Sequence, residues 1–313
     1  MSKHSSTPKD IFLRLFHIVV FYLMVTSFIT ILIQYVNALF PDALYFNFDS
    51  ISQSIILSTS ILVISTPAYL LSAWFLQKDI DKTPQKRDLK IVKWFVYLTL
   101  FISAITIIID LITFVYNFLN GELSTQFLLK MLIVLLVAVA VFGYFLWELK
   151  RTDAKSHTPK ILAWVLSSVI TLCVIAGFMI IGTPSQQRAR RFDNQRTSDL
   201  QMLQSEIVNY WTQKQKLPVA LTDLQDSISG FTVPVDPETK NSYQYKATEP
   251  LTFSLCATFV LQSDKYSNVN QNMYAPYGQY QQNWSHGAEE TCFERTIDPD
   301  LYKGNLGTKP LIR

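Results

Sequence analysis

The chain has 313 residues, of which 49% are hydrophobic and 16% are charged, and its formal net charge is +3. The charged fraction is below the roughly 25% of an average soluble domain, and so small a net charge excludes a nucleic-acid binder held by electrostatics. Long apolar runs fill residues 1–183, whereas residues 184–313 are polar and rich in turn signals. These two unlike halves exclude a soluble single-domain enzyme and a disordered chain.

Five apolar runs are long enough to cross a bilayer, which takes roughly 20 apolar residues in a helix. They lie at about 11–38, 53–77, 91–118, 125–147 and 161–182. The first run is too long for the apolar region of a cleavable signal peptide, and no A-x-A site follows it, so we expect an uncleaved anchor. The fold class that we predict is a membrane all-α bundle followed by a small extracytoplasmic α+β domain. The predicted parts are a four-helix transmembrane domain over 1–152, a fifth transmembrane helix within 153–183 and the α+β domain over 184–313.

The charges of the connecting segments predict the topology. Cationic residues gather at the N-terminal end (Lys3, Lys9, Arg14), between the second and third runs (Lys78, Lys82, Lys86, Arg87, Lys90, Lys93) and between the fourth and fifth (Lys150, Arg151, Lys155, Lys160). The alternate connections, about 39–52 and 119–124, hold only acidic charges. The positive-inside rule therefore puts the N-terminus in the cytoplasm and the C-terminal domain outside the cell membrane. An arginine cluster directly after the fifth run opposes this rule, but long domains translocate largely regardless of charge.

Two ionisable residues lie inside the apolar runs. Asp110 and Lys130 lie ~12 and ~8 Å below the outer surface, at 1.5 Å per helical residue. The short connection FLNGELS makes their helices antiparallel neighbours, so the two side chains can pair. The simplest interpretation is an intramembrane ion pair that fixes two helices. The alternatives are an ion or proton pathway, with Glu122 as an accessory acid, or a Lys130 side chain that reaches the interface.

Other residues of the apolar half have simpler explanations. We expect Arg14 to extend its guanidinium to the cytoplasmic interface and His17 to be an interfacial residue, although a histidine can titrate near neutrality. No nucleophile elbow, zinc-protease motif, P-loop or dinucleotide fingerprint occurs in the chain. We therefore expect no enzymatic activity, no cofactor and no metal.

Three stretches resemble a known family. ILIQYVNALFPD (31–42), WFVYLTLFISA (94–104) and IIIDLITFVYNFLNGELSTQFLLKMLIVLLVAVAVFGYFLWELKR (107–151) are similar to a bacterial integral membrane family catalogued as domain of unknown function 5671. The resemblance covers about residues 8–152, and Asp110, Glu122 and Lys130 lie in its most specific block. The family has no assigned activity, so the resemblance implies fold and membrane location only.

The polar half begins with a helical pattern. Its apolar stripe consists of Phe192, Leu200, Leu203, Ile207 and Tyr210. The helix is expected to end near Gln213, because Pro218 disfavours helix before it, and to continue the fifth run as one long helix kinked at Pro184. A short helical piece follows at about 219–228. NSYQYKA (241–247) and LTFSLCATFV (251–260) alternate polar and apolar residues and predict a β-hairpin, and the Asn-, Gln- and Tyr-rich stretch after it predicts a long polar loop.

This order resembles the globular half of type II secretion pseudopilins and type IV pilins. The matching pieces are Tyr210, Leu217-Pro218, Leu221 and Leu224, the Pro234–Pro237 stretch and Tyr243-Gln244-Tyr245. The fifth run begins KILAW, without the Gly-Phe cleavage site and early Glu of a pilin, and four runs precede it. We therefore do not expect the chain to be processed or to enter a pilus as a subunit.

The chain has three cysteines. Cys173 lies in the fifth run and is expected to be a small core residue. Cys256 and Cys292 fall in the outer domain, where disulfides persist, and we predict that they form one. The alternative is a metal site that uses Cys256, His286 and Cys292, although this spacing matches no zinc pattern.

The leading hypothesis is a non-enzymatic membrane protein that anchors a pilin-like interaction domain. Its expected partners are the lipid bilayer and, through residues 184–313, envelope, secretion or pilus-type proteins, with no nucleic acid. The alternative is a small transporter, channel or ion-coupled sensor that uses Asp110 and Lys130.

Overall fold

The computed structural model describes residues 8–41, 48–82, 90–150, 158–263 and 283–305. The chain divides into two compact units, Met1–Gly182 and Thr183–Arg313. The N-terminal tail, much of the cationic connections and most of the predicted polar loop lie outside the described residues.

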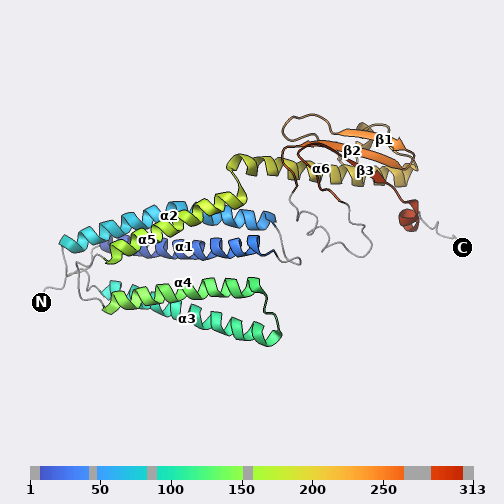
Figure 1. The fold of residues 1–313 in the computed structure, drawn as a ribbon. Helices are drawn as coiled ribbons and strands as arrows, with labels where there is room; N and C mark the ends of the chain where they lie inside the picture. The colour runs from blue at the N-terminus through green and yellow to red at the C-terminus, as the bar shows by residue number, and fades with distance from the viewer. Residues whose placement is uncertain (1–7, 42–47, 83–89, 151–157, 264–282, 306–313) are drawn as a thin grey trace. The chain divides into compact units, whose positions relative to one another are not determined.

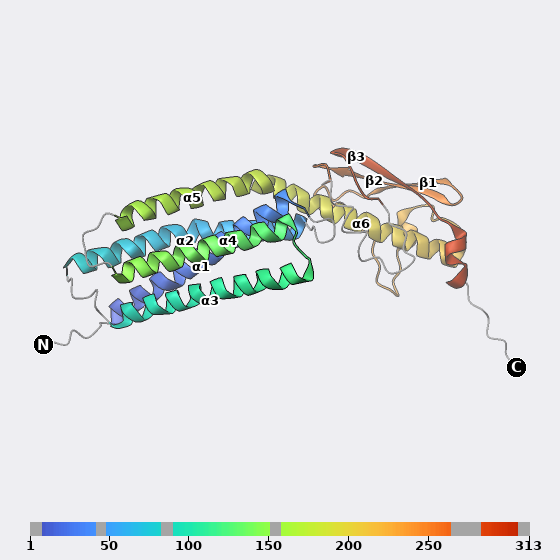
Figure 2. The ribbon, with the colours of Figure 1, turned by 60° about the horizontal axis from the view of Figure 1, so that its bottom comes forward.

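The first unit is a bundle of five long helices. They are α1 (Pro8–Leu39), α2 (Phe48–Lys82), α3 (Lys90–Asn120), α4 (Thr125–Lys150) and α5 (Thr158–Ile181). Each of the five is long and apolar enough to cross a membrane. The helices run lengthwise beside one another in both ribbon views (Figures 1 and 2), with α1 against α2 and α3 against α4. Each predicted apolar run is therefore a helix. The ends of each helix lie within a few residues of the predicted limits of its run.

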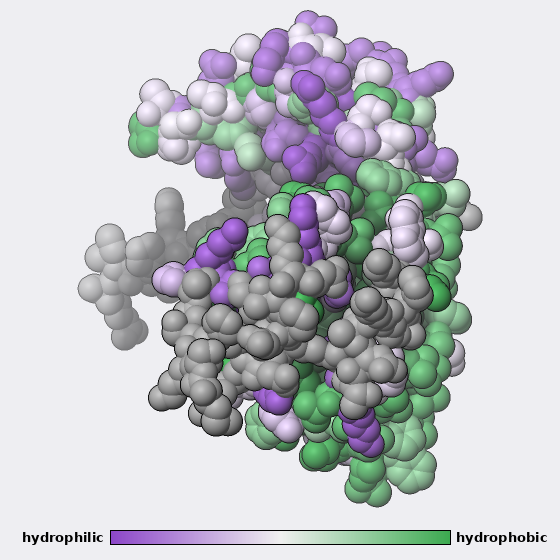
Figure 3. Space-filling model, turned by 90° about the vertical axis from the view of Figure 1, so that its left-hand side faces the viewer, coloured by the Kyte–Doolittle hydropathy of each residue, from purple (hydrophilic) through white to green (hydrophobic). Residues whose placement is uncertain are grey.

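The bundle has a narrow core and an apolar outside. Phe21, Met24 and Ile31 of α1 are buried against Ile55 and Leu62 of α2. Many large apolar side chains point outward, and the flank of the bundle visible in Figure 3 is largely hydrophobic. Soluble monomers rarely expose apolar patches larger than a few hundred Å², so this surface fits lipid better than water.

Polar contacts connect α1 to each of the other four helices. They are His17 with Ser72 of α2, Tyr22 with Thr99 of α3, Asn37 with Gln126 of α4, and the Tyr35 hydroxyl with the Cys173 carbonyl of α5. Between helices in lipid, such hydrogen bonds and close packing replace the hydrophobic driving force. The first helix therefore organises the bundle.

The second unit is an α+β domain. It contains α6 (Pro184–Lys214), the short helix η2 (Leu221–Leu224), the strands β1 (Gln244–Glu249), β2 (Thr252–Phe259) and β3 (Glu289–Thr296), and the short helix η3 (Pro299–Asn305). The strands form an antiparallel sheet in the order β1-β2-β3. The predicted hairpin is confirmed as β1 and β2, whereas no position had been predicted for β3.

One face of this sheet packs on α6, as Figure 1 shows. Leu200, Leu203 and Ile207 of α6 are fully buried against Phe253 and Leu255 of β2. Side chains of a strand alternate between its two faces, so the odd-numbered residues of β2 make the core. Leu200, Leu203 and Ile207 of the predicted apolar stripe thus hold the sheet, whereas Phe192 contacts the Arg188 guanidinium instead.

The junction between α5 and α6 differs from the expected kinked helix. Gly182 has a positive φ of 84°, which favours glycine, and Thr183 is extended. The Thr183 hydroxyl accepts from the backbone N–H of Gln186, and the Gln186 side chain accepts from the Thr183 backbone, forming a capping box. The helix is therefore interrupted for two residues, and α6 begins with its own cap.

Candidate functional site

A partly open cavity of about 270 Å³ lies between the helices of the bundle. All five helices line it, and its polar and aromatic lining includes Arg14, His17, Tyr69, Phe95, Tyr144 and Glu148. The lining comes from the start of α1, α3 and α5 and from the end of α2 and α4, so the cavity lies near one end of the bundle. By the sequence prediction this is the cytoplasmic end.

An aromatic wall is built around His17. The His17 ring stacks on Tyr69 with centroids 4.5 Å apart, and Phe21 packs edge-on against Phe145 at 5.3 Å. The Ser72 hydroxyl donates to the Tyr69 carbonyl, so its oxygen accepts from His17 Nδ1 at 2.7 Å. In the neutral ring, this arrangement leaves Nε2 as the acceptor nitrogen. The expectation that His17 is merely interfacial missed these contacts.

Charged groups surround the same cavity. Arg14 is only 8% exposed and interacts electrostatically with Asp10 of α1 and Asp79 of α2. Glu148 and Tyr144 of α4 interact electrostatically with Tyr69 of α2. The Arg14 side chain is thus buried near two carboxylates at this end of the bundle, and its position relative to the membrane interface stays a prediction.

The intramembrane residues singled out from the sequence lie elsewhere. Asp110 of α3 is 8% exposed, and its Oδ2 atom has no hydrogen-bond partner within the described part of the chain. Lys130 is half-buried in α4, the neighbour of α3, and Glu122 is exposed in the connection between them. None of the three lines the cavity. The Asp110–Lys130 ion pair stays a prediction.

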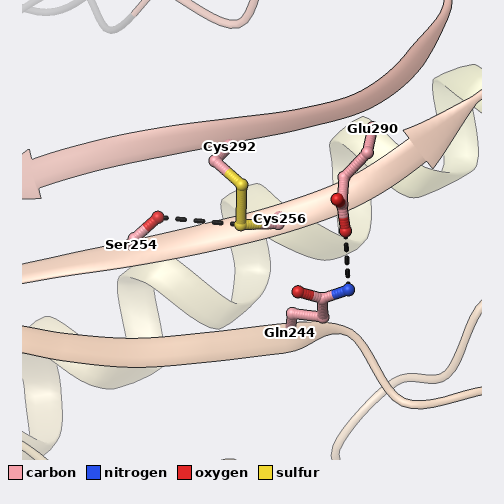
Figure 4. The surroundings of a disulfide bond; sticks show 5 residues. All are labelled: Gln244, Ser254, Cys256, Glu290 and Cys292. Carbon is pink, nitrogen blue, oxygen red and sulfur yellow. Dashed lines mark hydrogen bonds between the residues drawn. A yellow bond between two sulfur atoms is a disulfide. The ribbon is translucent and has the colours of Figure 1, made fainter.

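In the second unit, Cys256 and Cys292 form a disulfide between β2 and β3. The two residues lie directly opposite each other in the sheet, and Cys292 is exposed. Figure 4 shows the bond between the strands, beside a hydrogen bond from Gln244 of β1 to Glu290 of β3. Cys256 alternates with the core residues of β2, so the disulfide lies on the sheet face opposite α6.

The metal alternative has no support at these cysteines, because oxidised sulfurs are not thiolate ligands. His286 instead stacks on Phe259, with ring centroids 3.6 Å apart. No group of three or more His, Cys, Asp or Glu side chains that could hold a metal ion occurs among the described residues.

A buried charge cluster connects α6 to the segment before β1. Arg196 is 2% exposed and donates to Asp193 at 2.8 Å, to Asp236 at 2.6 Å and to Glu238 at 2.9 Å. Asp193 also accepts from the backbone N–H groups that follow β2, at Val260 and Leu261. One guanidinium therefore joins the helix, the Pro-Val-Asp-Pro turn and, through Asp193, the end of β2.

The electrostatics of this cluster favour its charged form. Burial acts to raise the pKa of Asp236, but hydrogen bonds from Arg196 and from the backbone N–H groups of Thr239 and Glu238 outweigh it and hold the pKa well below its usual range. Burial likewise acts to lower the pKa of Arg196, and its three carboxylate partners raise it instead. The cluster is therefore an ion network that joins α6, the segment before β1 and the end of β2.

Comparison with known proteins finds a family match within the first unit only. The family model described as Domain of unknown function (DUF5671) matches residues 10–145, which cover α1, α2, α3 and most of α4. The resemblance seen in the sequence is confirmed over these four helices. No curated protein and no solved structure matches the chain, and the pilin-like resemblance of the second unit stays a prediction.

Proposed function

We propose that this protein crosses the cell membrane five times and holds its α+β domain on the extracytoplasmic side as a non-enzymatic interaction module. The N-terminus is cytoplasmic in this arrangement, because the cationic connections then lie inside. The partner is the pilus, secretion or other envelope machinery that a pilin-like domain would meet there.

The disulfide is the observation that carries the proposal. Disulfides persist in oxidising compartments and are rare in the cytosol, where thiol reductants keep cysteines reduced. Cys292 is exposed on the sheet, so cytosolic reductants would reach this bond. A domain that keeps it is best accommodated outside the cytoplasm.

Exposed aliphatic side chains on the second unit support a binding role. This unit has a hydrophobic core of its own, to which α6, η2, β2 and β3 all contribute buried side chains. Two large aliphatic side chains in the segment after α6 are almost fully exposed, Val219 at 91% and Ile228 at 96%. Asp226 accepts from the backbone N–H groups of Ile228 and Ser229, which fixes the turn that presents Ile228.

In-cell cross-linking tests the interaction role. A photoreactive amino acid at position 228 is expected to capture a specific envelope protein in intact cells, identified by mass spectrometry of the adduct. The same residue at position 260, where Val260 is half exposed, serves as the matched control. Adducts that are absent, or that contain only this chain, would contradict the proposal.

A second candidate function is the passage or sensing of an ion in the membrane. The buried Asp110 carboxylate favours it, because burying a charged group in an apolar environment is costly and marks functional sites. Asp110→Asn that folds normally but loses function in cells would favour this candidate, whereas loss of folding would indicate the structural pair with Lys130.

A further inference from the structure

The bundle cavity has the size of a small-molecule site. Its volume of about 270 Å³ lies just below the roughly 300–1,000 Å³ of typical ligand pockets. Every residue of its lining belongs to a helix that is apolar enough to cross a membrane, and the lining lies near one end of these helices. In the proposed topology the cavity is therefore close to the membrane surface. No part of the proposed interaction role uses it.

His17 offers this cavity a hydrogen-bond acceptor. The Ser72 hydroxyl donates its one hydrogen to the Tyr69 carbonyl at 2.9 Å, so its oxygen accepts from His17 Nδ1 at 2.7 Å. The neutral imidazole then carries a lone pair on Nε2, for which no donor occurs among the residues that the structure describes. Because His17 lines the cavity, a ligand with an O–H or N–H donor can supply this hydrogen bond.

Aromatic rings line the cavity from four helices. They are Phe21 of α1, Tyr69 of α2, Phe95 of α3, and Tyr144 and Phe145 of α4. Phe21 contacts both Tyr69 and Phe145, so the rings form a connected wall. Aromatic rings attract one another in offset-stacked and edge-to-face arrangements, so this wall favours a ligand that contains a planar ring.

The charges at this end of the bundle favour a neutral ligand. The lining holds one charged residue of each sign, and both already interact with other groups, Arg14 with two carboxylates and Glu148 with Tyr69. Exposed cationic side chains also gather at this end of the helices without lining the cavity, namely Lys9, Lys78, Lys93 and Lys150. They repel a cation, whereas an anion would compete with the carboxylates near Arg14. A neutral donor meets neither obstacle.

We propose that the bundle cavity binds the head group of a membrane quinol. A quinol combines an O–H donor, a planar ring and no charge, and it dissolves in the bilayer. Its hydroxyl donates to His17 Nε2, and its ring packs among those of Phe21 and Phe145. Rings with one polar end settle at the membrane–water interface, as those of Trp and Tyr do, which is the depth of this cavity. The proposal rests on the membrane placement proposed above and is independent of the partner of the outer domain.

The test uses the purified full-length chain in detergent under argon, with tetramethylhydroquinone as the probe. Tetramethylbenzoquinone has the same carbon skeleton and no O–H donor, so it is the matched ligand. Equilibrium dialysis is expected to show saturable binding of the hydroquinone at one site per chain, about tenfold tighter than binding of the quinone, because only the hydroquinone donates to His17. Absence of saturable binding, or equal or tighter binding of the quinone, would overturn the proposal.

Three variants locate the site. His17→Phe keeps a ring to stack on Tyr69 and has no acceptor nitrogen, so it is expected to weaken hydroquinone binding about tenfold, to the level of the quinone. His286→Phe makes the same exchange in the second unit and is expected to leave binding unchanged. Ala163→Phe puts a ring at a lining position and is expected to abolish binding of both ligands.

Circular dichroism and size-exclusion chromatography establish that each variant is folded. Undiminished hydroquinone binding by folded His17→Phe or by folded Ala163→Phe would contradict the proposed site. The comparison of the two ligands on the unmodified chain decides the matter even where a variant does not fold. None of these measurements involves the cross-link at position 228, so the interaction role of the outer domain keeps its own test.

Discussion

Replacement of Arg196 by methionine is expected to destabilise the outer domain more than any substitution of a surface arginine. Methionine has a similar length and no charge, so it leaves Asp193, Asp236 and Glu238 together without their common cation. Arg196 is 2% exposed, and its partners Asp193 and Asp236 are buried as well. Removing one partner of a buried ion pair typically costs about 3–5 kcal/mol, because the remaining charges lose their compensation.

Hydrogen–deuterium exchange of the full-length protein measures this loss locally. Peptides from β2 report on the opening of the sheet, because Asp193 holds the backbone that follows that strand. A loss of about 3–5 kcal/mol corresponds to exchange faster by roughly a hundred- to a few thousand-fold, at 1.4 kcal/mol per tenfold.

Arg191→Met is the matched control, since Arg191 lies on the same helix and is exposed. Surface substitutions of this kind usually change stability by no more than about 0.5 kcal/mol. Equal exchange rates of β2 in the Arg196 and Arg191 variants would refute the reasoning that the cluster connects α6 to the sheet.

Three further outcomes are expected. Because Asp236 has a lowered pKa, its contribution to stability is complete above about pH 4 and is lost as the pH falls below that value. The thermal unfolding temperature of Asp236→Asn should therefore depend less on pH in this range than that of the unmodified protein. Reduction of the disulfide, or Cys256→Ser, should lower the free energy of unfolding of the outer domain by up to about 4 kcal/mol, because the bond to Cys292 closes a loop with a sequence separation of 36 residues. Hydrogen–deuterium exchange of β3 measures this loss. Gly177→Leu should loosen the bundle, since even a Cβ there would lie 3.0 Å from the Tyr35 hydroxyl; unchanged heat stability in detergent would contradict this.

The elements that the sequence predicts well are those with strong local constraints. A helix that crosses a bilayer needs about 20 apolar residues, so the five helices could be located from composition alone. The alternation of LTFSLCATFV marks β2 in the same way. β3 reads EETCFERT, in which the only large buried apolar residue is Phe293, so no alternation distinguishes it from a loop.

The cavity and the charge cluster depend on contacts between distant segments. Arg14 is buried and interacts electrostatically with Asp10 and with Asp79 of α2, and the contact with Asp79 has no signal in the sequence near Arg14. Arg196 meets Asp193 one helical turn away, which a sequence pattern could have shown, but Asp236 lies 40 residues further on. The Pro234–Pro237 stretch is singled out from the sequence through the pilin-like resemblance, which does not indicate that Asp236 accepts from a buried guanidinium.

The measurement that tests the central claim most directly is thiol labelling of intact cells with a membrane-impermeant maleimide. The account predicts no labelling of Cys256 and Cys292 until an impermeant reductant is added, and labelling of both afterwards, with the Cys256→Ser, Cys292→Ser double variant remaining unlabelled. Labelling without reductant would show that the disulfide is absent in cells. Labelling only after the cells are lysed would place the α+β domain in the cytoplasm and contradict the account.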